Sequence, residues 1–254
     1  MSQFGSMPLP IIGILILLFL FLGVELGYRG HGWLKRRGDK AQEDGPDHLL
    51  TAVLGLLALL LGFTFSLSLN RYEARRALVV QEANAIGTTW LRVQLLNDAD
   101  RAAISQLLRD YTKARIAWSD ADDGDDHLER TNLLQRQLWA AAGNAIRSES
   151  TIQLPLSVTD SMTQSFDAAS ARVAARSAHI PDRVLSILLI YAFLSMTMLG
   201  YNLATNGRPH RVATTLLLIL MTLALVVILD LDRSRSGAIM VSQQPLEDLR
   251  SSFQ

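Results

Sequence analysis

The sequence contains no cysteine, and it has only 7 prolines in 254 residues. The absence of cysteine excludes disulfide bonds, thiolate catalysis and metal sites with cysteine ligands. The net charge is zero, so the charge balance gives no indication of a nucleic-acid partner. Catalytic motifs are lacking too: the chain has no G-x-S-x-G pattern, no phosphate-binding loop and no dinucleotide-binding glycine pattern. We therefore do not expect an enzyme.

Charge is also missing from four long stretches: Met1–Val24, Leu49–Asn70, Val184–Gly207 and Val212–Leu229. Each stretch has the roughly 17–25 residues that an α-helix needs to cross a hydrocarbon core of about 30 Å. Lipid offers no hydrogen bonds to the backbone, and a helix satisfies its own. The first stretch lacks the positively charged start of a signal peptide, so we expect it to be retained, with a first span from Leu9 to Leu26. The sequence predicts an all-α, four-pass transmembrane protein.

The segment between the second and third stretches carries most of the charge and shows helical periodicity. No proline separates its first part from the second span, so one long helix is expected to leave the membrane. The apolar residues of this part repeat at heptad-like steps: Tyr72, Val79, Ala83, Ile86, Trp90 and Val93. We expect residues 1–70 to hold spans one and two, 71–182 an extramembrane helical bundle, 183–232 spans three and four, and 233–254 a short polar tail.

Further helices are expected within the extramembrane segment. The pair Asn97-Asp98 is placed to cap the start of the next helix. Another helix is predicted over Leu128–Ile146, and apolar spacing from Val158 to Val173 predicts one more. The dipeptide Leu154-Pro155 is expected in a connector, and Pro181 is expected to break the chain before the third span.

The second helix has two different faces when its residues are placed at about 100° each. One face has small and apolar residues inside the membrane and becomes polar from Ser66 onward. The face on the other side of the helix is mostly apolar. A water-filled path lined by the first face would explain the change. Close helix packing at Gly55 and Gly62 is the alternative explanation. The first face consists of Gly55, Leu59, Gly62, Phe63, Ser66, Asn70, Glu73, Ala77, Gln81, Asn84 and Thr88.

The stretch from Gly62 to Arg75, GFTFSLSLNRYEAR, resembles the second transmembrane helix of the bestrophins. In that family a membrane phenylalanine precedes an Arg-aromatic-aromatic-Glu-small-Arg signature, whereas this chain has one aromatic residue between arginine and glutamate. The stretches Glu82–Trp90, Leu229–Arg233 and Val241–Leu246 are similar to a bacterial bestrophin-like family of unassigned function. That second resemblance covers essentially the whole chain.

The resemblance implies a homo-oligomer, pentameric in bestrophins, that conducts ions through a central pore. Bestrophins line their narrow neck with apolar residues of the second helix. Because a ring of carboxylates favours cations, Glu73 on this face inclines us to monovalent cations as the permeant ions. Carried over by position, the constriction would consist of Leu59, Phe63 and Ser66, and the vestibule would be lined by Asn70, Glu73, Gln81, Asn84 and Thr88.

The resemblance also implies a location. We expect a bacterial inner membrane, contact with membrane lipids, no cofactor, and a helical segment that lies in the cytoplasm with both termini. The basic residues near the membrane do not decide this orientation, because seven lie on one side and six on the other. The alternative function is a non-conducting membrane scaffold or sensor whose helical segment binds a protein partner.

Two acidic groups could suggest calcium. The stretch Asp120–Asp126 fails the EF-hand pattern, because Arg130 falls where the twelfth-position glutamate is required. Animal bestrophins bind calcium after the fourth span, but this chain has only Asp230 and Asp232 there. We expect these two to cap the helix end or to pair with Arg233 and Arg235. The five histidines lack metal-binding spacing, so we expect no metal site.

Overall fold

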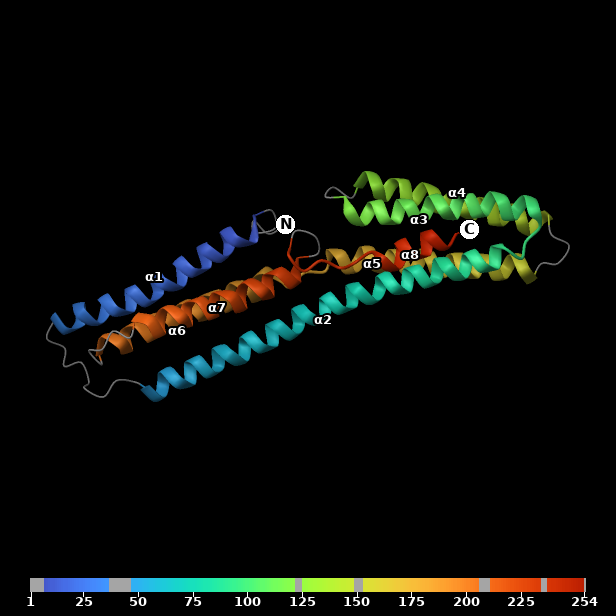
Figure 1. Cartoon of the computed structure of the whole chain (residues 1–254). Helices are drawn as coiled ribbons and strands as arrows, with labels where there is room; N and C mark the ends of the chain where they lie inside the picture. The colour runs from blue at the N-terminus through green and yellow to red at the C-terminus, as the bar shows by residue number, and fades with distance from the viewer. Residues whose placement is uncertain are drawn as a thin grey trace. The chain divides into compact units, whose positions relative to one another are not determined.

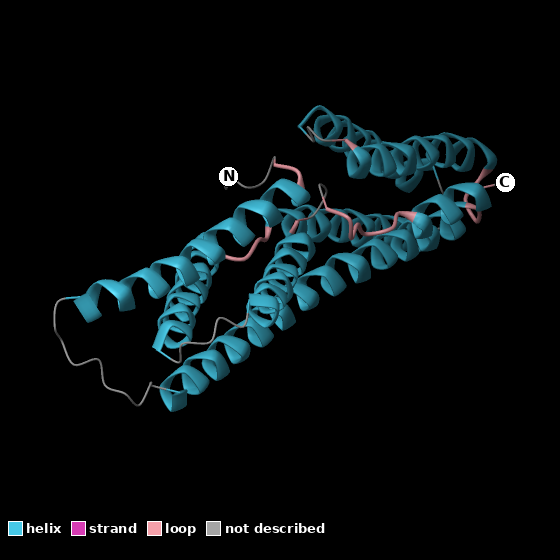
Figure 2. Ribbon diagram, turned by 60° about the vertical axis from the view of Figure 1, so that its left-hand side comes forward, coloured by secondary structure: helices cyan, strands magenta, loops and turns pink. Residues whose placement is uncertain are grey.

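The computed structural model describes residues 7–36, 47–121, 125–148, 153–205, 211–233 and 237–253. Within these ranges the chain forms eight α-helices. Figures 1 and 2 show helices joined by loops, without a β-strand in the described residues. The predicted all-α class is therefore confirmed. The helices belong to two compact units, the first of Met1–Tyr72 and His179–Met240, the second of Glu73–Ala178 and Val241–Gln254.

Four stretches of helix are long and apolar enough to cross a membrane, which confirms the four predicted spans. They are Leu9–Trp33, His48–Val93, Gln153–Thr205 and Arg211–Asp232. The third stretch covers two helices, α5 (Gln153–Ser177) and α6 (Asp182–Thr205), and its uncharged part lies in α6. These charge-free apolar runs form helices because a helix satisfies its own backbone hydrogen bonds, which lipid cannot do.

Helices α1 (Leu9–Arg36), α6 (Asp182–Thr205) and α7 (Arg211–Asp232) form most of the first unit, and α1 packs against both of the others. Their facing sides enclose an apolar cluster, to which Leu57 of α2 (Asp47–Val93) also belongs. Many outward side chains of these helices are large, apolar and exposed, which suits contact with lipid. The cluster includes Ile12, Leu20, Ala192, Met196 and Leu225.

Glycines allow α1 and α6 to approach very closely. A Cβ atom on Gly27 would lie 1.9 Å from the Thr197 carbonyl oxygen, and one on Gly200 would lie 2.0 Å from the Val24 carbonyl oxygen. Only a residue without a side chain fits at either position, because the obstacle is backbone that cannot rotate away. Small residues serve transmembrane helix packing in this way.

Helix α2 (Asp47–Val93) is one continuous helix of 47 residues. The prediction that the second span continues without a break into the charged segment is therefore confirmed. No proline lies between Asp47 and Val93, so no backbone N–H is lost from its hydrogen-bond ladder. The first part of α2 belongs to the first unit and the part from Glu73 to the second.

The second unit combines the end of α2 with α3 (Asp98–Asp120), α4 (Asp125–Ser148), α5 (Gln153–Ser177) and α8 (Gln244–Ser252). Asn97 caps α3 as predicted, since its side-chain oxygen accepts the Asp100 N–H at 3.0 Å. The helices bury an apolar core of their own, with Ile86, Ile104, Leu138 and Met162 among its most buried members.

Four details differ from the sequence predictions. Pro155 lies in the first turn of α5, not in a connector, because a missing N–H costs nothing there. The expected polar tail contains α8, whose Leu246 is fully buried. Helix α1 runs on to Arg36 past the predicted end at Leu26, and α4 begins at Asp125, inside the expected acidic loop.

Candidate functional site

The membrane part of α2 leaves the predicted constriction uncovered within the chain. Leu59 and Phe63 are 52% and 65% exposed, and Ser66 is exposed as well. The opposite side of the helix is packed, with Leu57 fully buried and Ser68 at 0% exposure. The helix thus turns its apolar-to-polar face away from the core of its own unit.

In the second unit, too, the predicted lining residues of α2 lie on the exposed side of the helix. Glu73, Gln81, Asn84 and Thr88 are all exposed, as is Asn70 at the end of the membrane part. The Thr88 hydroxyl donates to the Asn84 carbonyl oxygen at 2.9 Å, so it is satisfied by its own helix. Helical spacing puts all eight predicted lining residues on one side of α2.

Gly55 and Gly62 have no close neighbour among the described residues. A Cβ atom on either would meet nothing within 4 Å, in contrast to Gly27 and Gly200. The described part of the chain therefore contains no helix packed closely against these two glycines.

A buried charge cluster lies on the other side of α2 and was missed by the sequence analysis. The Glu82 carboxylate accepts from Arg115 Nε of α3 through Oε1 and from Arg172 Nη1 of α5 through Oε2. All three side chains are buried. The Trp118 ring lies beside both guanidinium groups, 4.3 Å from Arg115 Cζ and 5.3 Å from Arg172 Cζ.

The signal that could have revealed this cluster is the place of Glu82 in the heptad pattern. It falls between Val79 and Ile86 on the apolar face, where an unpaired carboxylate would be costly. A partner of opposite charge was therefore required. Its identity could not be read from the sequence, since Arg115 and Arg172 lie 33 and 90 residues further along.

Tyr111 lies next to this cluster in the core of the second unit. Burial raises the pKa of the Tyr111 hydroxyl to about 12, although the positive charge of Arg115 acts in the opposite direction. Gln135 Nε2 donates to the Tyr111 hydroxyl oxygen at 3.2 Å. The phenol therefore stays neutral at physiological pH and has a structural place in the core.

The two aspartates at the end of α7 bind backbone amides. Asp232 Oδ1 accepts the Ile180 N–H and Asp230 Oδ1 accepts the Ala238 N–H, both at 2.8 Å. The first bond joins the end of α7 to the residues just before α6. The sequence predicts a helix cap or pairing with Arg233 and Arg235, whereas these two bonds are to the backbone amides of Ile180 and Ala238. Arg235 lies outside the described residues.

Parts of the acidic stretch Asp120–Asp126 belong to helices: α3 ends at Asp120 and α4 begins at Asp125. Residues 122–124 lie outside the described residues. Across the described ranges, no group of three or more histidine, aspartate or glutamate side chains could hold a metal ion.

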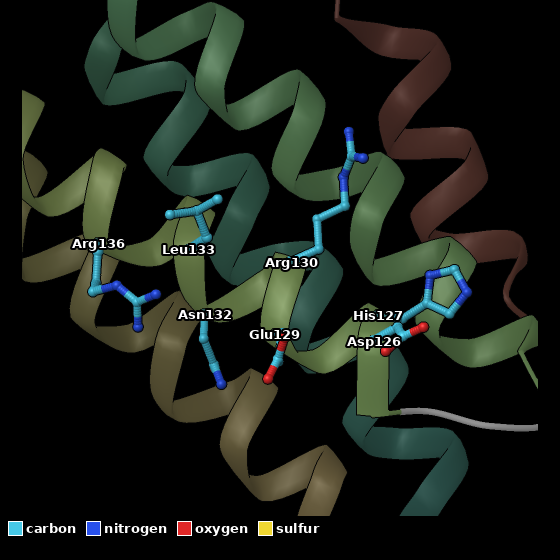
Figure 3. A pocket seen from close by; sticks show the side chains of 7 residues that line it. All are labelled: Asp126, His127, Glu129, Arg130, Asn132, Leu133 and Arg136. Atoms are coloured by element: carbon cyan, nitrogen blue, oxygen red, sulfur yellow. The ribbon is translucent and has the colours of Figure 1, made fainter.

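A shallow hollow of about 800 Å³ lies on the outer side of α4 (Figure 3). All of its side chains come from the first turns of this single helix, and they point in different directions rather than toward a common centre. Such an arrangement offers no paired acid and base. The lining residues are Asp126, His127, Glu129, Arg130, Asn132, Leu133 and Arg136.

Comparison with known proteins identifies a family match over most of the chain. The model of the Bestrophin-like domain matches residues 14–246. None of the curated proteins that were compared matches the chain.

Solved structures share the fold at low sequence identity. A crystal structure of a bacterial bestrophin homolog from Klebsiella pneumoniae is 17% identical, with a TM-score of 0.69 over 94% of this chain and 95% of that chain. A mutant bestrophin homolog from the same organism is 15% identical, with a TM-score of 0.70 over 95% and 97%. A third structure, described as a membrane protein, is 15% identical with a TM-score of 0.72 over 94% and 96%.

Proposed function

Because the chain belongs to the Bestrophin-like domain family, whose model covers residues 14–246, we propose that it forms a homo-oligomeric ion channel. Several copies, five by analogy with bestrophins, would surround a central axis in the membrane. Helix α2 of each copy would line the pore. Permeant inorganic ions and membrane lipids would be its partners, and no cofactor is needed for such a role.

The observation that carries this proposal is the exposed face of α2. Leu59 and Phe63 are among the exposed large apolar residues of the chain. Exposed Ser66 and Asn70 follow them on the same side of the helix. Apolar rings can form a constriction, and polar side chains beyond them would hold water in a vestibule. A single copy cannot enclose such a path, so an oligomer is required.

Glu73 supports a preference for monovalent cations. It is exposed, and it is the only charged residue among the eight proposed lining positions. Five copies would place a ring of carboxylates at the start of the vestibule, and such rings favour cations. Asn84 and Thr88 would continue the vestibule with neutral polar groups.

We place the protein in a bacterial inner membrane, with the helical segment and both termini in the cytoplasm, following its resemblance to bestrophins. The basic residues of the chain do not decide this orientation. A reporter fused to the C-terminus would test it. Activity of the reporter only outside the cytoplasm would reverse the assignment.

Phe63→Ala tests the pore. The purified full chain would be reconstituted in planar bilayers, and single-channel currents of wild type and variant would be compared. We expect the smaller side chain to widen the constriction and to raise conductance. Phe65→Ala is the matched control, because Phe65 is also exposed on α2 but lies on the opposite face of the helix. Silent wild-type bilayers, or equal currents for Phe63→Ala and wild type, would contradict the proposal.

A second candidate is a membrane scaffold or sensor that does not conduct. The outer side of α4 favours it, since Trp139 is 53% exposed and Leu133 is 48% exposed outside the membrane part. Exposed aromatic and apolar residues of this kind are typical of protein contacts. Co-purification with a partner in fixed proportion, together with silent bilayers, would favour this function over the channel.

A further inference from the structure

The charge cluster around Glu82 lies on the side of α2 that faces the core, behind the residues proposed to line the vestibule. Glu82 is at 0% exposure, whereas Gln81 and Asn84, on the same turn, are exposed. A helix with its side chains is about 10–12 Å across. The cluster therefore lies within about one helix diameter of the water that the proposed vestibule would contain.

The cluster carries more positive than negative charge. One carboxylate, Glu82, is shared by two guanidinium groups, Arg115 and Arg172, which leaves a net charge of plus one. Among the described residues, neither arginine forms an ion pair with another carboxylate.

The remaining partners of the two arginines are neutral. Arg115 Nη2 donates to the Ala169 carbonyl oxygen at 3.5 Å, and Arg172 Nη2 donates to Gln243 Oε1. Arg115 Nη1 is buried and has no hydrogen-bond partner among the described residues. The indole ring of Trp118 lies beside both groups. These contacts solvate the guanidinium groups but do not cancel their charge.

A charge in this position would act on ions at a distance. Salt screens exposed charges within about 8–10 Å, but it screens buried charges much less. Charges behind the wall of a narrow aqueous space raise the local concentration of oppositely charged ions. In an oligomer, one such charge would be repeated in every subunit around the same space.

We propose that the Glu82–Arg115–Arg172 cluster is a determinant of charge selectivity, acting through the vestibule wall without touching the permeant ion. It favours anions and so opposes the exposed Glu73, which favours cations. The inference rests on the proposed channel function. It also predicts effects of opposite sign when the negative and positive members of the cluster are neutralised.

Arg172→Met and Glu82→Gln test these signs. Arg172→Met leaves Glu82 paired with Arg115 and brings the cluster to zero charge. Glu82→Gln brings it to plus two. The double variant returns it to plus one, the wild-type value. Reversal potentials of the reconstituted full chain in asymmetric potassium chloride give the anion-to-cation permeability ratio for each.

We expect this ratio to fall about two- to threefold in Arg172→Met, to rise by a similar factor in Glu82→Gln, and to return to the wild-type value in the double variant. A role in folding alone would not produce shifts of opposite sign or their cancellation. Arg172→Lys keeps the charge, and Gln243→Ala removes the neutral partner; both should keep the wild-type ratio.

Particle size and melting temperature in detergent identify variants that fail to assemble. If Glu82→Gln fails, Arg172→Met and the double variant still carry the sign test. A conducting wild type with an unchanged ratio in Arg172→Met overturns the inference and leaves the channel function standing. A silent wild type overturns both.

Discussion

The ring of Phe253 stacks on the ring of Trp90, with centroids 4.2 Å apart and 25° between the planes. Arg109 Cζ lies 5.1 Å from the centroid of the same indole ring. Leu249 of α8 lies close to Gly87, one turn before Trp90, where an added Cβ atom would meet it at 3.2 Å. The C-terminal residues are therefore part of the core of the second unit.

Phe253→Ala should destabilise the second unit by about 3 kcal/mol, because it removes a buried aromatic ring and leaves a cavity beside Trp90. Thermal unfolding of the detergent-solubilised protein, followed by tryptophan fluorescence, would measure the loss. Ser252→Ala, at an exposed neighbouring position, is the control. Equal melting temperatures for Phe253→Ala and wild type would show that the stack contributes little.

Gly27→Ala should separate α1 from α6, because its new methyl group would overlap the Thr197 carbonyl oxygen. The free energy of unfolding should fall by about 1–3 kcal/mol, the usual cost of overpacking. Gly30→Ala is a matched control on the same helix, since a Cβ atom there would meet nothing within 4 Å. Yield of folded protein and melting temperature should fall for the first variant only. Similar losses in both would show that the overlap at Gly27 is not their cause, since alanine favours the helix more than glycine does.

The raised pKa of Tyr111 leads us to expect a loss of stability at high pH. Its pKa is raised from 10.0 to about 12 in the folded chain. Above pH 10 the unfolded chain therefore releases this proton before the folded chain does, and the free energy of unfolding falls as pH rises toward 12. The full loss would be about 2–3 kcal/mol.

Tyr111→Phe should remove that part of the alkaline decline. Unfolding of both proteins across this pH range, with tyrosinate absorbance as the measure of ionisation, would show it. A Tyr111→Phe variant that loses stability with pH as steeply as wild type would mean that other groups control the decline.

Glu73→Gln should shift the reconstituted channel toward anions, because it removes the only charge from the proposed lining. We expect the cation-to-anion permeability ratio to fall about twofold or more. Glu129→Gln is the control, since Glu129 is an exposed carboxylate on α4. An unchanged reversal potential for Glu73→Gln would show that the Glu73 carboxylate does not lie on the path of the ions.

Features that depend on residues close together in the sequence were predictable. The charge-free runs gave the four spans, and the absence of proline between Asp47 and Val93 gave the continuity of α2. Asn97 was recognised as a cap because a cap is made by neighbours in sequence. The exposure of Leu59 and Phe63 agrees with the face assigned to them, while their role as a constriction remains a prediction.

Features that depend on distant partners were not predictable in this way. The stretch around α8 reads as polar, but Phe253 is buried against Trp90, which lies far away in the sequence. Glu82 lay within a recognised stretch, but its two arginine partners come from α3 and α5. Pro155 was assigned to a connector because proline breaks helix interiors, and the first-turn exception depends on where the helix starts.

The sharing of one carboxylate by two arginines has an evolutionary consequence. A homologous chain that lost Glu82 alone would keep two cations packed against each other, and one that lost both arginines would keep a lone anion in apolar surroundings. We therefore expect positions 82, 115 and 172 to change together in related sequences. An alignment in which the three vary independently would show that selection does not treat them as one group.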